Sequence, residues 1–232
     1  MNKLNKMLCA ALTLVLLNVG NIANSDSSNF AGPYVGLQVL GLGAEFDGES
    51  NSTAGTSSAV RDKAQAGATV TTFGYEAGYV LPIGGSLALD VGAQYLEGKG
   101  SVTGSNDDSD NTAGNVKFTF DKHLTYYIAP TIALSDTSSL YVKMGLSEAD
   151  TGVAGDVTTP GTLSGEMWAL GTRTVLDSGI FIRTEAGYTE YNGISAHGLG
   201  EGTQGTTRIN SNTSFSAEPT MVHGTVSLGF RF

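Results

Sequence analysis

Apolar and polar residues alternate with a period of two along most of the chain. Between Leu87 and Tyr95 every second residue is apolar, and the positions between them include Asp90 and Gln94. This alternation predicts a β-strand with one apolar and one polar face. Eight segments have the pattern, at residues 34–46, 73–81, 87–95, 118–134, 140–146, 168–176, 180–188 and 222–232.

The connections between these segments alternate between short and long. Short turns are expected at 82–86, 135–139 and 177–179, and long polar loops at 47–68, 99–115, 148–161 and 192–213. This arrangement is typical of an all-β fold, an eight-stranded antiparallel transmembrane β-barrel with short periplasmic turns and long extracellular loops.

A soluble β-sandwich also alternates and is the alternative fold. The strand ends favour the barrel, because their apolar face carries aromatic residues, as in the girdles at the two membrane interfaces. These residues are Tyr34, Phe73, Tyr79, Tyr95, Trp168, Tyr188, Phe230 and Phe232. The opposite face carries glycine and charged residues, where a sandwich would bury Leu, Ile and Val.

The first 25 residues differ from the rest of the chain. Lys3 and Lys6 precede an apolar run of about a dozen residues, and small residues stand at Ala23 and Ser25. This order is typical of a secretory signal peptide. We therefore expect a signal peptide at 1–25 and an outer-membrane β-barrel at 26–232, in the cell outer membrane.

Composition excludes several classes of protein. The formal net charge of −10 argues against a nucleic-acid partner. The mean hydropathy of −0.01 excludes a bundle of transmembrane helices. Cys9, within the predicted signal peptide, is the one cysteine of the chain, so we expect no disulfide framework.

Three segments resemble a known family. Residues 225–232 end on Phe232 with Phe230 two positions earlier, and residues 30–38 and 182–191 are similar to a first and a seventh strand. They resemble the small outer-membrane β-barrel family, which includes opacity-type proteins and the membrane domain of outer-membrane protein A. The resemblance implies that Phe230 and Phe232 form the signal for the barrel assembly machinery. It also implies contact with outer-membrane lipid and lipopolysaccharide.

The polar faces of the predicted strands carry charges of both signs. When the residues between each charge and the nearest short turn are counted, six charged residues lie at similar heights in the barrel and form one layer. They are Glu76, Asp90, Lys143, Arg173, Arg183 and Glu185. Lys117, Asp121 and His123 are also expected inside, with Phe118 and Phe120 on the lipid face. Because buried charges need partners, we predict a salt-bridge network in the lumen. It would serve either as structural packing or as a narrow ion pathway.

An enzyme is not favoured by the sequence. A catalytic serine needs a histidine base within reach, and the nearest candidates, His223, Ser227 and Glu218, span too much of one strand. Residues 106–111 have oxygen ligands for Ca²⁺ but lack the glycine and distal glutamate of a helix-loop-helix calcium site. We expect no catalytic residue, no metal and no cofactor.

The expected function is a structural, surface-exposed role in the outer membrane. The alternatives are a narrow porin for small solutes or ions, and an adhesin. Adhesion would use an extracellular ligand bound through loops 47–68, 99–115, 148–161 and 192–213.

Overall fold

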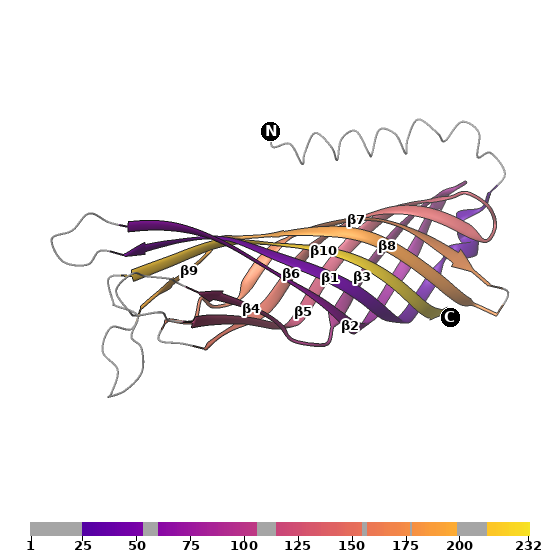
Figure 1. Cartoon of the computed structure of the whole chain (residues 1–232). Coiled ribbons are helices and arrows are strands. Elements are labelled where there is room, and N and C mark those ends of the chain that lie inside the picture. Colours follow the sequence, from indigo (N-terminus) through magenta and orange to yellow (C-terminus); the bar gives the residue numbers. More distant parts are fainter. Residues whose placement is uncertain (1–24, 53–59, 106–114, 155–156, 177, 199–212) are drawn as a thin grey trace.

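The computed structural model describes residues 25–52, 60–105, 115–154, 157–176, 178–198 and 213–232. They form one antiparallel sheet that closes on itself, because β1 pairs with both β2 and β10 (Figure 1). The strands are β1 Gly32–Ser52, β2 Val60–Gly84, β3 Leu87–Leu96, β4 Gly100–Ser105, β5 Asn115–Ala133, β6 Ser138–Ala154, β7 Leu163–Val175, β8 Ile180–Tyr191, β9 Ile194–His197 and β10 Thr213–Arg231.

These segments make eight barrel strands, as the sequence predicts. Both β3 and β4 pair with β5, so β4 continues the path of β3. Likewise β9 continues β8, because both pair with β10. The predicted closed eight-stranded antiparallel barrel is therefore confirmed. Within the described residues, no helix is long and apolar enough to cross a bilayer.

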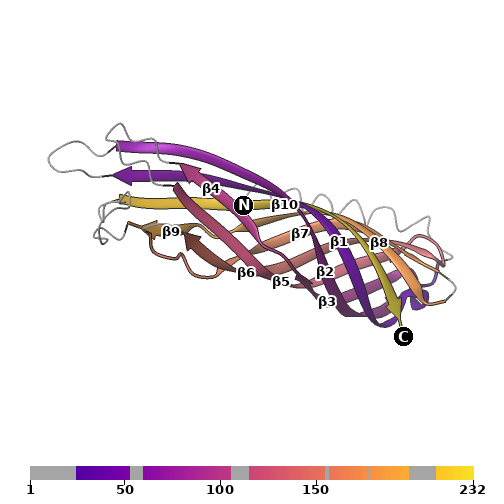
Figure 2. The same cartoon turned by 60° about the horizontal axis from the view of Figure 1, so that its bottom comes forward.

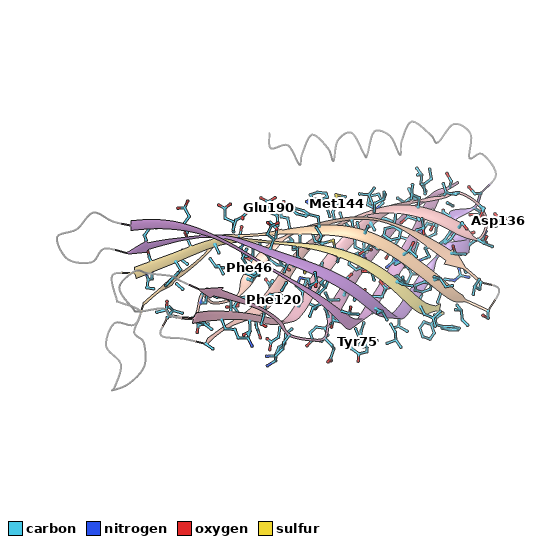
Figure 3. All side chains as sticks on the ribbon, in the orientation of Figure 1. Phe46, Tyr75, Phe120, Asp136, Met144 and Glu190 are labelled. Atoms are coloured by element: carbon cyan, nitrogen blue, oxygen red, sulfur yellow. The ribbon has the colours of Figure 1, made fainter. Side chains whose placement is uncertain are left out.

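One part of the barrel, which we call the turn half, has an apolar outer face. It extends from the three short turns to the level of the cross-strand pair Glu166 and Glu190. Its exposed side chains include Leu37, Tyr75, Ile128, Leu170, Ile182, Val226 and Leu228. Figure 3 shows Tyr75 pointing away from the barrel, and Asp136 marks the short-turn end.

The strands extend further than the sequence predicts. In place of the predicted loops 47–68, 99–115, 148–161 and 192–213, β1 continues to Ser52, β2 begins at Val60, β4 and β9 appear, and β6 reaches Ala154. Of these predicted loops, residues 53–59, 106–114, 155–156 and 199–212 lie outside the described residues. The prediction was wrong because backbone hydrogen bonds continue the ladder whatever the side-chain polarity. We call the part of the barrel beyond the level of Glu166 and Glu190, into which these strands extend, the loop half.

A β-bulge in β5 changes which face its residues occupy. The register between β5 and β6 shifts between Asp121 and Leu124, and Lys122 has a φ of 50°. Two consecutive residues, Lys122 and His123, thus oppose one residue of β6, which reverses the alternation beyond them.

The bulge overturns four of the predicted orientations. Phe118 packs against the internal cluster of Val157 and Ala196, and the ring of Phe120 lies 6.0 Å from that of the buried Phe46. Both phenylalanines were expected on the lipid face. Lys117 and Asp121 were expected inside, but Lys117 is exposed and Asp121 pairs with the exposed Lys99 at 3.3 Å.

A short 3-10 helix, η2 (Ser27–Phe30), covers the short-turn end. Its Phe30 is 1% exposed and packs in an apolar cluster with Tyr34, Val80, Ala88, Ala133, Val175 and Phe181. The carboxylate of Asp26 caps η2 by accepting the Ser28 N–H, which lowers the pKa of Asp26. Arg231, beside the C-terminus, donates to the carbonyl oxygens of Asn29 and Ala31. In Figure 2 the C-terminus lies at this same end of the barrel.

The predicted signal peptide lies almost wholly in residues 1–24, outside the described residues.

Candidate functional site

The turn half encloses a layer of charged side chains contributed by five strands. It contains the six residues singled out in the sequence: Glu76 on β2, Asp90 on β3, Lys143 on β6, Arg173 on β7, and Arg183 and Glu185 on β8. Each is at most 7% exposed. All six face the lumen because they occupy the positions between the lipid-facing residues of their strands. We call this set the charge layer.

Arg183 joins the two carboxylates on one side of the charge layer. Its Nη1 lies 2.7 Å from Oε2 of Glu76, and its Nη2 contacts Oδ2 of Asp90. The same Asp90 oxygen lies 3.0 Å from Nη2 of Arg173. Two guanidinium groups therefore share one carboxylate, and Glu76 provides the second negative charge.

Lys143 and Glu185 form the other side of the charge layer. Nζ of Lys143 lies 2.5 Å from Oε2 of Glu185 and 3.2 Å from Oε1 of Gln94. The second carboxylate oxygen of Glu185 lies 3.2 Å from Nε2 of His223. The ion pairs thus connect strands β2, β3, β6, β7 and β8 across the lumen, with β10 joined through His223.

Three tyrosines hydrogen-bond within the charge layer. The Tyr34 hydroxyl donates to Oδ1 of Asp90 at 2.8 Å and lies 2.5 Å from the Tyr127 hydroxyl. The Tyr141 hydroxyl donates to Oε2 of Glu185 at 2.9 Å. Tyr34 was expected in an aromatic girdle, but it is 2% exposed and points inward. The sequence did contain this signal, since Tyr34 stands two residues before Gly36, on the polar face of its strand.

Basic side chains also lie over the faces of these rings. The Arg173 guanidinium is centred 4.4 Å from the Tyr34 ring, and Nζ of Lys143 lies 4.3 Å from the Tyr127 ring. Arg183 lies 4.7 Å from the ring of Tyr141. Cation–π contacts stabilise the cations by an amount that increases with desolvation.

Glycines on the inner face provide the space for these tyrosines. A Cβ at Gly78 would lie 2.6 Å from the Tyr34 hydroxyl, and one at Gly92 would lie 2.7 Å from the Tyr127 hydroxyl. A Cβ at Gly171 would overlap the Tyr141 ring. At these three positions the missing side chain of glycine accommodates an aromatic ring of the charge layer.

Formal charges within the layer cancel, since Glu76, Asp90 and Glu185 oppose Lys143, Arg173 and Arg183. Removing one member of a buried pair costs about 3–5 kcal/mol, because the other charge remains buried without compensation. The charge layer can thus fill the lumen with side chains whose charges cancel, and its ion pairs connect the strands.

The two buried histidines, His123 and His223, have separate partners. Nε2 of His123 lies 2.6 Å from the hydroxyl of Tyr191, and His223 contacts Glu185. Ser227 is buried, but its hydroxyl has no partner among the described residues. Glu218 is exposed on the opposite face of β10, so the grouping of His223, Ser227 and Glu218 is not assembled. In the part of the chain that the structure describes, no cluster of three or more His, Cys, Asp or Glu could hold a metal ion.

The two terminal aromatics lie on the outer face of β10 and just beyond it. Phe230 is 42% exposed and Phe232 is 73% exposed, and their rings meet edge to face at 5.2 Å. Both side chains are therefore accessible from outside the barrel.

Comparison with known proteins identifies the fold and the family. The crystal structure of the outer membrane protein OprG from Pseudomonas aeruginosa is 12% identical, with 91% of this chain and 100% of that one covered and a TM-score of 0.51. The outer membrane protease OmpT from Escherichia coli is 9% identical, with coverage of 87% and 97% and a TM-score of 0.45. Ail, the attachment invasion locus protein of Yersinia pestis, is 9% identical, with coverage of 85% and 99% and a TM-score of 0.35.

At this identity, the likeness to OprG concerns the fold alone. No protein of curated function matches the sequence. A family model for the outer membrane protein beta-barrel domain matches residues 9–207, which is most of the chain. The protein therefore belongs to the outer membrane β-barrel family and is located in the outer membrane.

Proposed function

We propose that the protein is a non-enzymatic structural barrel that supports outer-membrane integrity and presents its loop half at the cell surface. The observation that carries this proposal is the filled charge layer. An eight-stranded barrel is just wide enough for side chains to fill, and six of them occupy this one level, each at most 7% exposed.

Apolar clusters on both sides of the charge layer support the same role. Toward the short turns, η2 places Phe30 in a buried cluster with Phe181 and Val175. Toward the loops, Leu163, Tyr191 and Met221 form another buried cluster. A hydrated solute would have to cross apolar, close-packed regions before and after the charge layer, which opposes passage.

The contacts of the histidines support a non-enzymatic role. His123 and His223 bond to Tyr191 and Glu185 respectively. A hydroxyl nucleophile needs a base within hydrogen-bond reach, and among the described residues neither histidine has a hydrogen bond to a serine or threonine side chain.

A narrow pore is the second candidate, and a specific observation favours it. Within the charge layer, Oε1 of Glu76 and Nε of both Arg173 and Arg183 have no hydrogen-bond partner among the described residues. Buried polar groups of this kind are commonly hydrated. A hydrated, charged lumen could pass small ions if the side chains rearranged.

Planar-bilayer conductance separates the two roles. The wild type is compared with an Arg173→Ala/Arg183→Ala variant and with a control carrying Thr172→Ala and Thr184→Ala. Thr172 and Thr184 lie on the outer face of the same two strands and are 2.9 Å apart. Each protein is first tested for folding by its heat-dependent migration in electrophoresis.

A silent wild type, a silent control and a leaking arginine variant are expected. Steady wild-type channels whose ion selectivity changes in the arginine variant would contradict the structural role and establish the pore.

A further inference from the structure

Strand β5 is weakly held where it passes from the loop half into the turn half. On one side, its pairing with β4 ends at Phe120 and its pairing with β3 begins at His123. On the other side, the bulge interrupts its pairing with β6 between Asp121 and Leu124. Residues 121–123 therefore form a joint, because the backbone ladder is disrupted on both sides of the strand at the same point.

A side-chain contact spans the lumen at this joint. Nε2 of His123 lies 2.6 Å from the hydroxyl oxygen of Tyr191, and the two rings meet edge to face with their centroids 6.1 Å apart. In the sheet β6 and β7 separate β5 from β8, so the contact connects two strands that share no backbone pairing. We call the pair of His123 and Tyr191 the lumen strap.

The lumen strap is buried at the base of the loop half. His123 and Tyr191 are each 8% exposed. Tyr191 belongs to the apolar cluster that includes Leu163 and Met221, and its hydroxyl oxygen lies 4.0 Å from Sδ of Met221. The strap thus closes the lumen among apolar side chains, on the loop side of the charge layer.

The imidazole of His123 has no charged partner. Among the described residues it forms no ion pair, and its Nδ1 is buried without a hydrogen-bond partner. When Nε2–H donates to the Tyr191 hydroxyl, an added proton has to go to this Nδ1. His223 differs, because its Nε2 lies 3.2 Å from a carboxylate oxygen of Glu185, which compensates an imidazolium.

The neighbours of His123 also oppose a positive charge. Those on β3, β8 and β10 are uncharged or basic, and they are Leu96, Tyr191 and His223. The carboxylates of β6 beside the bulge, Glu148 and Asp150, are exposed on the outer face. Loss of hydration, together with the nearby charge of His223, lowers the pKa of His123 to about 4.

We propose that the lumen strap is an acid-sensitive closure of the loop half. Protonation places an imidazolium among apolar side chains, which costs free energy, so the strap separates. The loop-half part of β5 then moves at the joint of residues 121–123 and uncovers the internal cluster of Leu163, Tyr191 and Met221. The ion pairs of the charge layer keep their partners, so the lumen beneath stays closed.

The direction of the pH effect follows from proton linkage. The pKa of His123 is about 4 in the closed barrel and returns to about 6.5 when the strap opens. Between these values the open form binds more protons, so closure is lost as the pH falls from about 6.5 toward 4. With these two values, the ratio of open to closed molecules rises about twentyfold between pH 7 and pH 5.

Hydrogen exchange of the full-length protein in lipid bilayers tests the proposal. Exchange rates at pH 7 and pH 5 are each divided by the intrinsic rate of the unprotected amide at that pH. We expect protection to fall about twentyfold in the wild type at 117–120 and 189–191, beside the strap. Protection at 141–145 and 181–185, beside the charge layer, should stay constant.

Matched variants assign the pH dependence to the lumen strap. His123→Gln retains a hydrogen-bond donor for Tyr191 but cannot gain the proton, so its protection should not change with pH. His197→Gln alters an exposed histidine of the loop half and should behave as the wild type does. Constant protection in the wild type, an equal fall in His123→Gln, or a fall abolished by His197→Gln would overturn the proposal.

A measurement on the wild type keeps the test independent of how the variants fold. The chain contains three histidines, so each imidazole can be followed by nuclear magnetic resonance as the pH is lowered. We expect the His123 signal to titrate below the exposed His197 signal, together with the loss of protection at 117–120. Titration of His123 at the same pH as His197, or without any loss of protection, would contradict the proposed closure.

Discussion

The turn half and the loop half of the barrel have opposite orientations of polar and apolar side chains. In the turn half the outside is apolar, with residues such as Leu170 and Leu228, and the inside contains the charge layer. In the loop half the outside carries Lys122 and Asp150, and the inside carries Phe46 and Phe120. Figure 3 places both of these phenylalanines in the half away from Asp136.

The same strands pass through both halves, so the difference reflects the surroundings. Lipid favours an apolar outer face and leaves the lumen to polar side chains. Beyond the membrane, water surrounds the barrel, and apolar residues are stabilised inside, as in a soluble protein. The level at which the orientation inverts, near Glu166 and Glu190, therefore marks the outer edge of the bilayer. Four predictions test this comparison.

The largest effect is expected in the charge layer. Arg183→Ala removes the positive charge that pairs with the buried carboxylates of Glu76 and Asp90. It should lower the free energy of unfolding by about 3–5 kcal/mol, because negative charge then remains buried without its partner. Urea unfolding in lipid bilayers measures the change. The control is Thr184→Ala on the outer face of the same strand, and an equal loss in both variants would contradict the role of the ion pairs.

The next effect concerns the outer face of the turn half. Leu170 is 53% exposed on β7, so Leu170→Arg should cost about 2–4 kcal/mol because it places a charge in hydrocarbon. Asp150→Arg on the outer face of the loop half should cost less than about 1 kcal/mol, since it breaks only the exposed pair with Lys122. The same unfolding assay applies. Similar costs at the two positions would mean that the bilayer edge is misplaced.

A smaller effect is expected inside the loop half. Phe46 is 8% exposed, and Phe46→Ala should cost about 2 kcal/mol through lost apolar burial. Hydrogen exchange should become faster at the backbone amides of 41–49 and remain slow near the charge layer. Uniformly faster exchange along β1 would argue against two separate regions.

The smallest effect is expected at the bulge. Lys122→Gly relieves the positive φ of 50° but removes the exposed ion pair with Asp150, which lies at 3.1 Å. These changes oppose each other, so stability should stay within about 1 kcal/mol of the wild type. Unfolding together with iodide quenching of Trp168 would show whether the barrel is unchanged. A loss of several kcal/mol would mean that Lys122 makes a stabilising contribution beyond this pair.

The sequence by itself determined the class of the fold and the members of the charge layer. Alternation with a period of two identifies which residues share a face. The short turns mark one end of the barrel, and the number of residues from a turn gives the height of each residue in the barrel. These local signals place Glu76, Asp90, Lys143, Arg173, Arg183 and Glu185 on inner faces at similar heights.

Only the tertiary structure decided how far the strands extend, where the alternation reverses and which groups pair. Beyond the bilayer the apolar signal of the outer face disappears while backbone pairing continues, so β1 extends to Ser52. The bulge at Lys122 sends Phe120 inward, although residue order alone placed it outside. Arg183 pairs with Glu76 and Asp90 from distant strands. Such partners are fixed by the register of the closed barrel, because cross-strand distances depend on how the sheet closes.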